Sequence, residues 1–199
     1  MLQYRPSSAS WIHIGTLIAG LIVIQYFHAN YDLAWDRIKI EHGEYWRLIG
    51  GHFTHNNISH LALNCVGIIL VLQLINAEIP GVTLIHLTLL IALLTGLFLF
   101  LWEPQLMYYV GFSAVLHGML ACFAISTLPK NAIFGIAILS LLALKLVFEG
   151  QPQFTANLID IRVATEAHFW GFVSGILVGG LYTGFLYWQK TNSLACSSK

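Results

Sequence analysis

Ser113 and two histidines provide most of the chemical capacity of this sequence. Ser113 lies in the apolar stretch GFSAVLHG, two residues after Gly111, and His117 follows four residues later. A third candidate, His168, opens a later apolar stretch. A hydroxyl within hydrogen-bond reach of an imidazole is the minimum for an activated serine nucleophile. These residues therefore indicate acyl-transfer chemistry in apolar surroundings.

The composition defines what kind of elements must position these residues. Hydrophobic residues make up 57% of the 199 residues and charged residues only 9%, whereas about a quarter of a soluble domain is charged. We therefore predict an all-α polytopic membrane protein with a single domain over residues 1–199. The formal net charge is zero and there is no basic patch, so nucleic acid is not an expected partner.

The cysteine pattern points to no cofactor. Cys65, Cys122 and Cys196 lie far apart and form neither a disulfide framework nor a CxxC metal motif. No metal ion and no cofactor are expected from this sequence.

Six apolar segments have a length that suits a membrane-spanning helix, which needs about 20 residues. Proline-containing breaks separate several of them. The first lacks a cleavage site and a strongly basic start, so we interpret it as a retained anchor. Lys and Arg are equally numerous on the two sides of the membrane. The segments on the side of the two termini are shorter, however, and so have the higher density of these residues, which favours cytoplasmic termini. The predicted spans are residues 11–28, 60–79, 82–101, 113–128, 132–148 and 168–188.

The fourth segment is too short to cross the whole bilayer. Its 16 residues give about 24 Å of helix, against a hydrocarbon core of about 30 Å. If its inner end reaches the cytoplasmic face, Ser113 lies below the outer surface. Non-helical backbone at that depth must be buried in protein or line a wet cavity. We therefore expect residues 102–112 to dip inward and a water-filled pit to open above Ser113.

Small residues predict which helices pack together. Gly171, Gly175 and Gly179 recur every four residues in the sixth segment, and such a ridge allows close backbone approach. Ala114 and Gly118 form a matching face on the fourth segment. Packing these faces brings the polar starts of both segments together.

This packing predicts a Ser–His dyad of Ser113 and His168. No acidic residue falls at a position that predicts a third member, and the nearest one, Glu166, has no assigned partner. His117 is an alternative base, but an i,i+4 pair places its imidazole beneath the hydroxyl rather than beside it. A purely structural alternative is that the serine hydroxyl bonds the carbonyl four residues earlier.

The second segment supplies candidate donors for an oxyanion. His60 and Asn64 are four residues apart and share one helix face. Acyl transfer needs donors directed at the developing oxyanion, each worth roughly 3 kcal/mol. We expect His60, Asn64 and the Ser113 backbone N–H to provide them.

Three stretches carry a resemblance to a known family. They are YWRLIGGHFTHNNISHLALN, GFSAVLHG and AHFWGFVSG, in that order along the chain. The match as a whole runs from Trp46 to Gly179. Together the sequence resembles the rhomboid family of intramembrane serine proteases. The resemblance implies a six-helix rhomboid-like bundle with Ser113 as nucleophile, His168 as base, and His60 and Asn64 as oxyanion donors. It also implies that other residues support the site, namely Trp46, Arg47, Gly111, His117, Gly171 and Gly175.

Two departures from the family pattern narrow the resemblance. Ala114 replaces the usual glycine after the serine, and His117 stands where relatives often carry an aromatic residue. With the short chain and the stretch GGHFTH, the sequence resembles the rhombosortase branch. That branch implies membrane-anchored substrates whose C-terminal tail has a Gly-Gly motif, one transmembrane helix and a basic end. It further implies a bacterial inner membrane location with the site open to the periplasm.

Other classes of protein remain as alternatives. A general rhomboid protease would act on other substrates, and an inactive rhomboid-like protein would only bind them. Nine histidines also suggest a metal or haem protein. The zinc protease motif HExxH is absent, but His60 and His168 could imitate a bis-histidine haem site.

Overall fold

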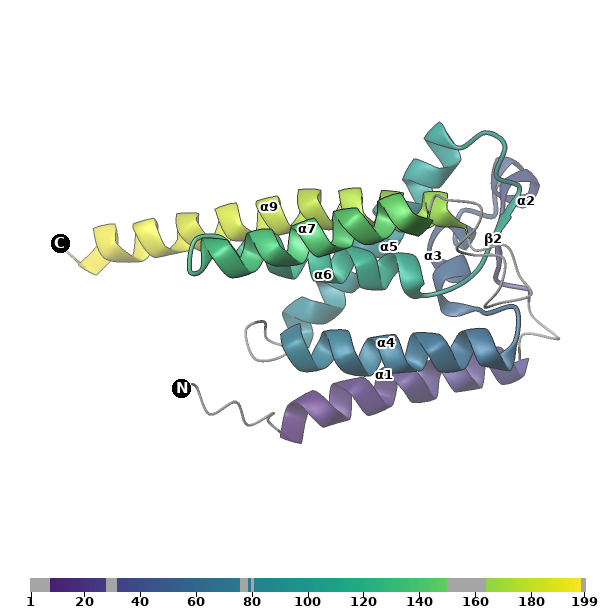
Figure 1. The fold of residues 1–199 in the computed structure, drawn as a ribbon, viewed down its shortest axis with the longest axis horizontal. Coiled ribbons are helices and arrows are strands. Elements are labelled where there is room, and N and C mark those ends of the chain that lie inside the picture. Colours follow the sequence, from purple (N-terminus) through teal and green to yellow (C-terminus); the bar gives the residue numbers. More distant parts are fainter. Residues whose placement is uncertain (1–7, 28–31, 76–78, 80, 150–163, 198–199) are drawn as a thin grey trace.

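The computed structural model describes residues 8–27, 32–75, 79, 81–149 and 164–197, and six long helices dominate them (Figure 1). Residue 28 and most of the outer loop predicted between residues 149 and 167 lie outside these ranges. The long helices are α1 (Ser8–Phe27), α4 (Ile58–Ile75), α5 (Gly81–Trp102), α6 (Ser113–Thr127), α7 (Ala132–Glu149) and α9 (Thr165–Ser197).

Length and composition allow four of these helices to cross a membrane. They are α4, α5, α7 and α9, while α6 and the apolar part of α1 are shorter. Large apolar side chains such as Leu70, Leu141 and Leu181 are exposed on three of the four, which suits a lipid surface and not water. The prediction of an all-α membrane protein is therefore confirmed, and the count of six spans stays a prediction.

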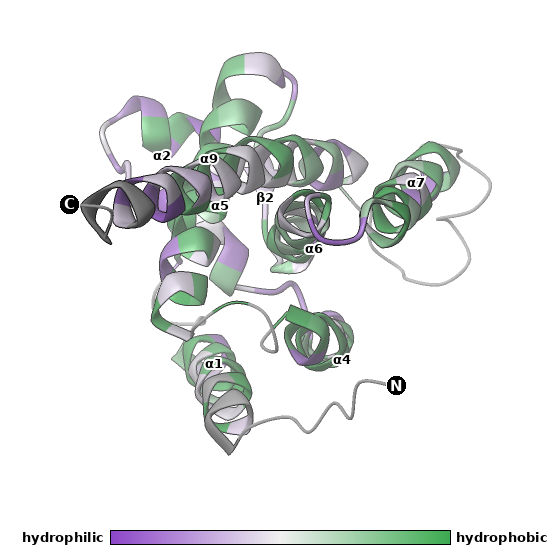
Figure 2. Cartoon of the chain, turned by 90° about the vertical axis from the view of Figure 1, so that its left-hand side faces the viewer, coloured by the Kyte–Doolittle hydropathy of each residue, from purple (hydrophilic) through white to green (hydrophobic). Residues whose placement is uncertain are grey.

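Helix α6 lies in the interior of the bundle, next to α9, α7, α5 and α4 (Figure 2). Nearly all side chains from Ala114 to Ala124 are buried, so this part of α6 presents little surface to lipid. Its 15 residues give about 22 Å of helix, whereas the 33 residues of α9 give about 50 Å. In Figure 1, α9 accordingly runs well past the ends of α6 and α7.

The contact between α6 and α9 is made backbone to backbone. A methyl group added at Gly171 would overlap the carbonyl oxygen of Ala114, and one at Gly175 would overlap that of Gly118. Further along, a methyl group at Gly179 would lie 2.9 Å from the Cα atom of Cys122. Only glycine permits this spacing, and the helices meet through the small faces expected from the sequence.

Short elements form a layer, here called the outer layer, over the ends of the helices at which α6 and α9 begin (Figure 1). The strands β1 (Trp35–Asp36) and β2 (Tyr108–Tyr109) pair antiparallel, with Trp35 opposite Tyr109. This ribbon was not predicted, because two-residue strands carry no periodicity that a sequence can reveal. The helices α2 (Arg37–Glu41), α3 (Arg47–Gly50) and η1 (Gly51–Phe53) complete the layer.

Two buried arginines fasten this outer layer. The guanidinium of Arg37 donates to the carbonyl oxygens of Leu99, Phe100, Glu103 and Leu106 at 2.9–3.1 Å. It thus adds hydrogen bonds to carbonyls in the last turn of α5 and in the segment that follows the helix.

Arg47 holds the first outer loop in a similar way. Its side chain, 5% exposed, donates to the carbonyl oxygen of Ala34 at 2.8 Å and pairs with Glu44 at 2.6 Å. The neighbouring Trp46 side chain is instead more than half exposed. Arg47 therefore ties α3 to the segment before β1, and its support of the site stays a prediction.

Candidate active site

Ser113 is the first residue of α6 and lies beside the first turn of α9. Its Oγ atom is 2.7 Å from Nε2 of His168. Ser113 is half-buried, and His168 is 5% exposed. The preceding residues Val110, Gly111 and Phe112 are buried, so this non-helical backbone is enclosed by protein. The water-filled pit above Ser113 stays a prediction.

Gly111 fixes the entry into α6. Its φ of +126° lies in the region that side chains disfavour, and a methyl group there would approach the His60 ring to 2.7 Å. Its N–H donates to the carbonyl oxygen of Gly51 at 3.0 Å, and the hydroxyl of Tyr109 donates to its carbonyl oxygen. The backbone before the serine is therefore held on three sides.

Tyr109 connects this loop to the serine. Its ring is buried, and burial raises the pKa of the phenol; contacts with the Ala114 backbone and the Ser113 side chain oppose this only in part. Ala114 is fully buried in the same apolar cluster as Tyr109 and Trp35. The methyl group of Ala114 thus packs within the protein, in the cluster that includes Trp35 of β1 and Tyr109 of β2.

The candidate oxyanion donors His60 and Asn64 lie on α4, with the His60 ring next to Gly111. The Asn57 side chain accepts from the His60 N–H at 2.8 Å and so caps the start of α4. The His60 ring packs against Gly111 and meets His55 edge to face, with ring centres 5.1 Å apart. Asn64, 3% exposed, donates one amide hydrogen to the His60 carbonyl oxygen at 3.0 Å. This bond uses one of the two amide hydrogens of Asn64 and leaves the second for another acceptor.

His117 lies beneath the pair and contacts the serine's backbone. Its ring stacks on that of His168, with centres 4.4 Å apart and planes 17° from parallel. Nδ1 of His117 is 2.7 Å from the Ser113 carbonyl oxygen, and Nε2 is 2.9 Å from Nζ of Lys145. Among its described bonds none involves the serine hydroxyl, so the geometry favours His168 as the base.

The expectation that no acid stands beside His168 was wrong. Oε2 of Glu149, the last residue of α7, is 2.9 Å from Nδ1 of His168. Glu166, the acid nearest in sequence, instead accepts a 3.5 Å bond from Thr165. One feature of the sequence could have identified Glu149: Lys145, four residues earlier, is a charge within an apolar run and needs a partner.

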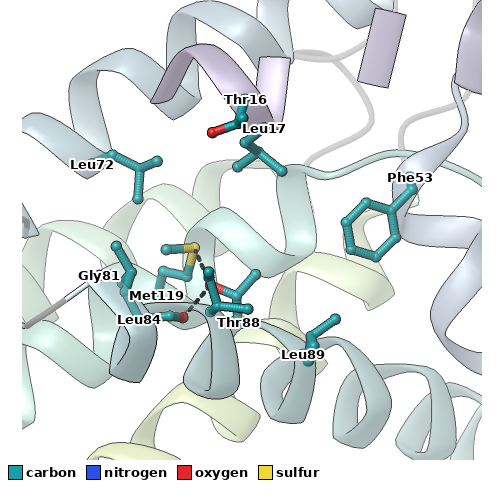
Figure 3. A pocket seen from close by; sticks show the side chains of 10 residues that line it. Thr16, Leu17, Phe53, Leu72, Gly81, Leu84, Thr88, Leu89 and Met119 are labelled. Atoms are coloured by element: carbon teal, nitrogen blue, oxygen red, sulfur yellow. Dashed lines mark hydrogen bonds between the residues drawn. The ribbon is translucent and has the colours of Figure 1, made fainter. Parts of the chain in front are cut away.

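The apolar cavity in Figure 3 lies away from this chemistry. It has a volume of about 270 Å³ and lies between α1, α4, α5 and α6. Its lining contains no titratable side chain. The Thr88 hydroxyl, one of its few polar groups, already bonds the Leu84 carbonyl oxygen at 2.8 Å and contacts the Met119 sulfur. This cavity therefore offers no reactive group.

The fold and the site define a helical membrane protein in which two adjoining helices join a hydroxyl to an imidazole. Comparison with known families specifies the class further: a family model described as Rhomboid domain matches residues 42–185. The chain therefore belongs to the rhomboid family, a family of intramembrane serine proteases and their homologues. No match is found among curated proteins.

Proposed function

We propose that this protein is an active intramembrane serine protease with Ser113 as nucleophile and His168 as general base. The supporting observation is the 2.7 Å contact between Ser113 Oγ and His168 Nε2. It joins two helices whose distance is set by glycine contacts. A nucleophile bonded to a base in this way is the arrangement that serine acyl transfer requires.

The reaction follows from these two groups. Nε2 of His168 takes the hydroxyl proton while Oγ of Ser113 bonds to the substrate carbonyl carbon, and the carbonyl π electrons move to the oxygen. When the tetrahedral intermediate collapses, the C–N bond breaks and the imidazolium gives its proton to the leaving amine. Water then repeats both steps on the acyl-enzyme and releases the acid and free Ser113.

The negative oxygen formed in the first step requires donors already in place. The proposal assigns them to the Ser113 backbone N–H, the His60 ring and the free amide hydrogen of Asn64. The pinned conformation of Gly111 supports this assignment, because it keeps the His60 ring next to the segment that carries Ser113.

The proposed substrates are membrane-anchored proteins with a C-terminal tail that carries a Gly-Gly motif before its transmembrane helix. The resemblance to the rhombosortase branch, to which Ala114 after the serine contributes, supports this. Glycine also suits the reaction, because a helix must unwind before a carbonyl becomes accessible, and Gly-Gly unwinds easily. We place the enzyme in a bacterial inner membrane, with cytoplasmic termini and the site open to the periplasm.

Co-expression with a Gly-Gly-tailed protein tests the proposal. Wild-type enzyme should cleave the tail and react with a fluorophosphonate probe, and Ser113→Ala and His168→Ala should lose both activities. Ser126→Ala is the matched control, because Ser126 lies on the same helix but bonds the Cys122 carbonyl oxygen.

Three measurements separate the alternatives. Probe labelling that is unchanged in Ser113→Ala and His168→Ala would exclude the assignment. Equal cleavage after both tail glycines become leucine would favour a general rhomboid protease. A Soret band in the purified protein would favour a haem protein.

A further inference from the structure

Helix α7 places two charged side chains against the Ser–His pair. Lys145 and Glu149 are four residues apart and so lie on one face of α7, where they form an ion pair. Lys145 also contacts Nε2 of His117 at 2.9 Å, and Glu149 contacts Nδ1 of His168 at 2.9 Å. Charges within a membrane helix are costly and mark function more often than packing.

With Lys145 and Glu149 ionised and both histidines neutral, these contacts fit a single arrangement of protons. An ammonium group only donates, so Nε2 of His117 accepts from Lys145, and its Nδ1–H donates to the Ser113 carbonyl oxygen. Glu149 only accepts, so the proton of His168 lies on Nδ1. Its Nε2 then has the free lone pair that accepts the Ser113 hydroxyl proton.

We infer that Glu149 is a positioning residue for His168 and that Lys145 holds both Glu149 and His117 in place. This inference rests on the proposed function and turns its dyad into a Ser–His–Glu arrangement. Glu149 fixes the tautomer of His168 and, after the proton transfer, stabilises the imidazolium while remaining ionised itself. Because Lys145 donates to Nε2 of His117, that nitrogen carries no proton in this arrangement, and the ring stacked on His168 adds no opposing charge.

A metal ion is the competing explanation for this cluster. Donor atoms of His117, Glu149 and His168 lie within 4.8 Å of one another. However, the lone pair of an imidazole lies in its ring plane, and the planes of these rings are stacked 17° from parallel. One ion cannot lie in both planes, and Lys145 already occupies the position next to Nε2 of His117. The geometry therefore favours positioning over ligation.

Kinetics of the full-length enzyme on the Gly-Gly-tailed substrate test the inference. Glu149→Gln should lower kcat by at least about 100-fold with little change in KM, because substrate binding does not involve this carboxylate. Glu149→Asp should recover part of the loss. Glu103→Gln is the matched control: this carboxylate bonds Nε1 of Trp170 rather than a histidine, and its kcat should stay close to wild type.

Several outcomes would overturn it. These are a kcat of Glu149→Gln within about twofold of wild type, or activity that requires zinc and is lost with a chelator. Wild-type protein with ¹⁵N-labelled histidine provides a test that does not depend on a variant folding: the His168 proton should be found on Nδ1, and a proton on Nε2 would refute the inference. Loss of cleavage in Glu149→Gln with unchanged cleavage in Ser113→Ala would instead refute the proposed function.

Discussion

At the scale of single residues, the serine depends on the backbone that precedes it. Gly111 combines a positive φ with the close approach of the His60 ring, and two hydrogen bonds hold its peptide groups. Small shifts of this segment would move the Ser113 N–H and hydroxyl together. Shifts of about 1 Å can cost about 100-fold in rate.

Gly111→Ala should therefore reduce the rate of fluorophosphonate labelling by about 100-fold, because the new methyl group collides with His60. Gly43→Ala is a matched control, since Gly43 also has a positive φ, of +100°, but nothing lies within 4 Å of a methyl group added there. Both variants have a backbone cost of about 1–2 kcal/mol, and only the first should lose labelling. Equal losses in both would show that backbone strain, and not the contact with His60, is responsible.

The residues of the site differ in how far a sequence can predict them. Ser113, His168, His60 and Asn64 stand in motifs, so their identity is visible without coordinates. Glu149 belongs to no such motif: it lies 19 positions before His168 on a different helix. Its role depends on how α7 is rotated and packed, and that information is distributed over the whole bundle.

At the scale of the elements, the glycine face of α9 controls the distance between α6 and α9. Gly175→Ala should destabilise the protein by about 1–3 kcal/mol, because its methyl group would overlap the Gly118 carbonyl oxygen. It should also reduce probe labelling, because α9 must move away and take His168 with it. Thermal unfolding in detergent and labelling of the folded fraction measure the two effects.

Gly180→Ala provides the control for this prediction. Gly180 lies on the same helix with nothing within 4 Å of the added methyl group, so the change should stabilise α9 by up to about 1 kcal/mol. Similar destabilisation in both variants would contradict the role of the α6–α9 contact.

The helices were predictable and their outer connections were not. Long apolar runs placed five of the six long helices to within a few residues, because a membrane span has a fixed length. The exception is α9, which starts at Thr165 and reaches Ser197, beyond the predicted 168–188. Its polar end does not continue the apolar run but is still helical. The β1–β2 ribbon and the capping of α5 by Arg37 depend on tertiary contacts alone.

At the scale of the whole molecule, a buried histidine in the outer layer should make stability depend on pH. His52 in η1 has no exposed surface. Burial lowers its pKa to about 4, and backbone groups of Ala92 and Gly111 offset this only in part. The unfolded chain takes up a proton near pH 6.5, so it holds more protons than the folded protein between pH 6.5 and 4. Stability is therefore complete above pH 6.5 and falls as the pH is lowered.

The expected loss is about 3 kcal/mol by pH 4, which thermal unfolding at pH 7.5 and 4.0 would measure. His52→Gln should show a smaller decline over this interval, because its side chain does not titrate. His42→Gln, a change at an exposed histidine, should decline like wild type. An undiminished decline in His52→Gln would assign the acid sensitivity to other groups.

The contact between α6 and α9 also affects how such a chain can diverge over generations. Since bare backbone sets the separation of Ser113 and His168, the lipid-facing side chains of the other helices have no part in it. Apolar residues there can be exchanged for one another during neutral drift, while a single added carbon at Gly171 or Gly175 would be eliminated by selection. Across generations, the separation of Ser113 and His168 is thus preserved by a few positions that have no side chain at all.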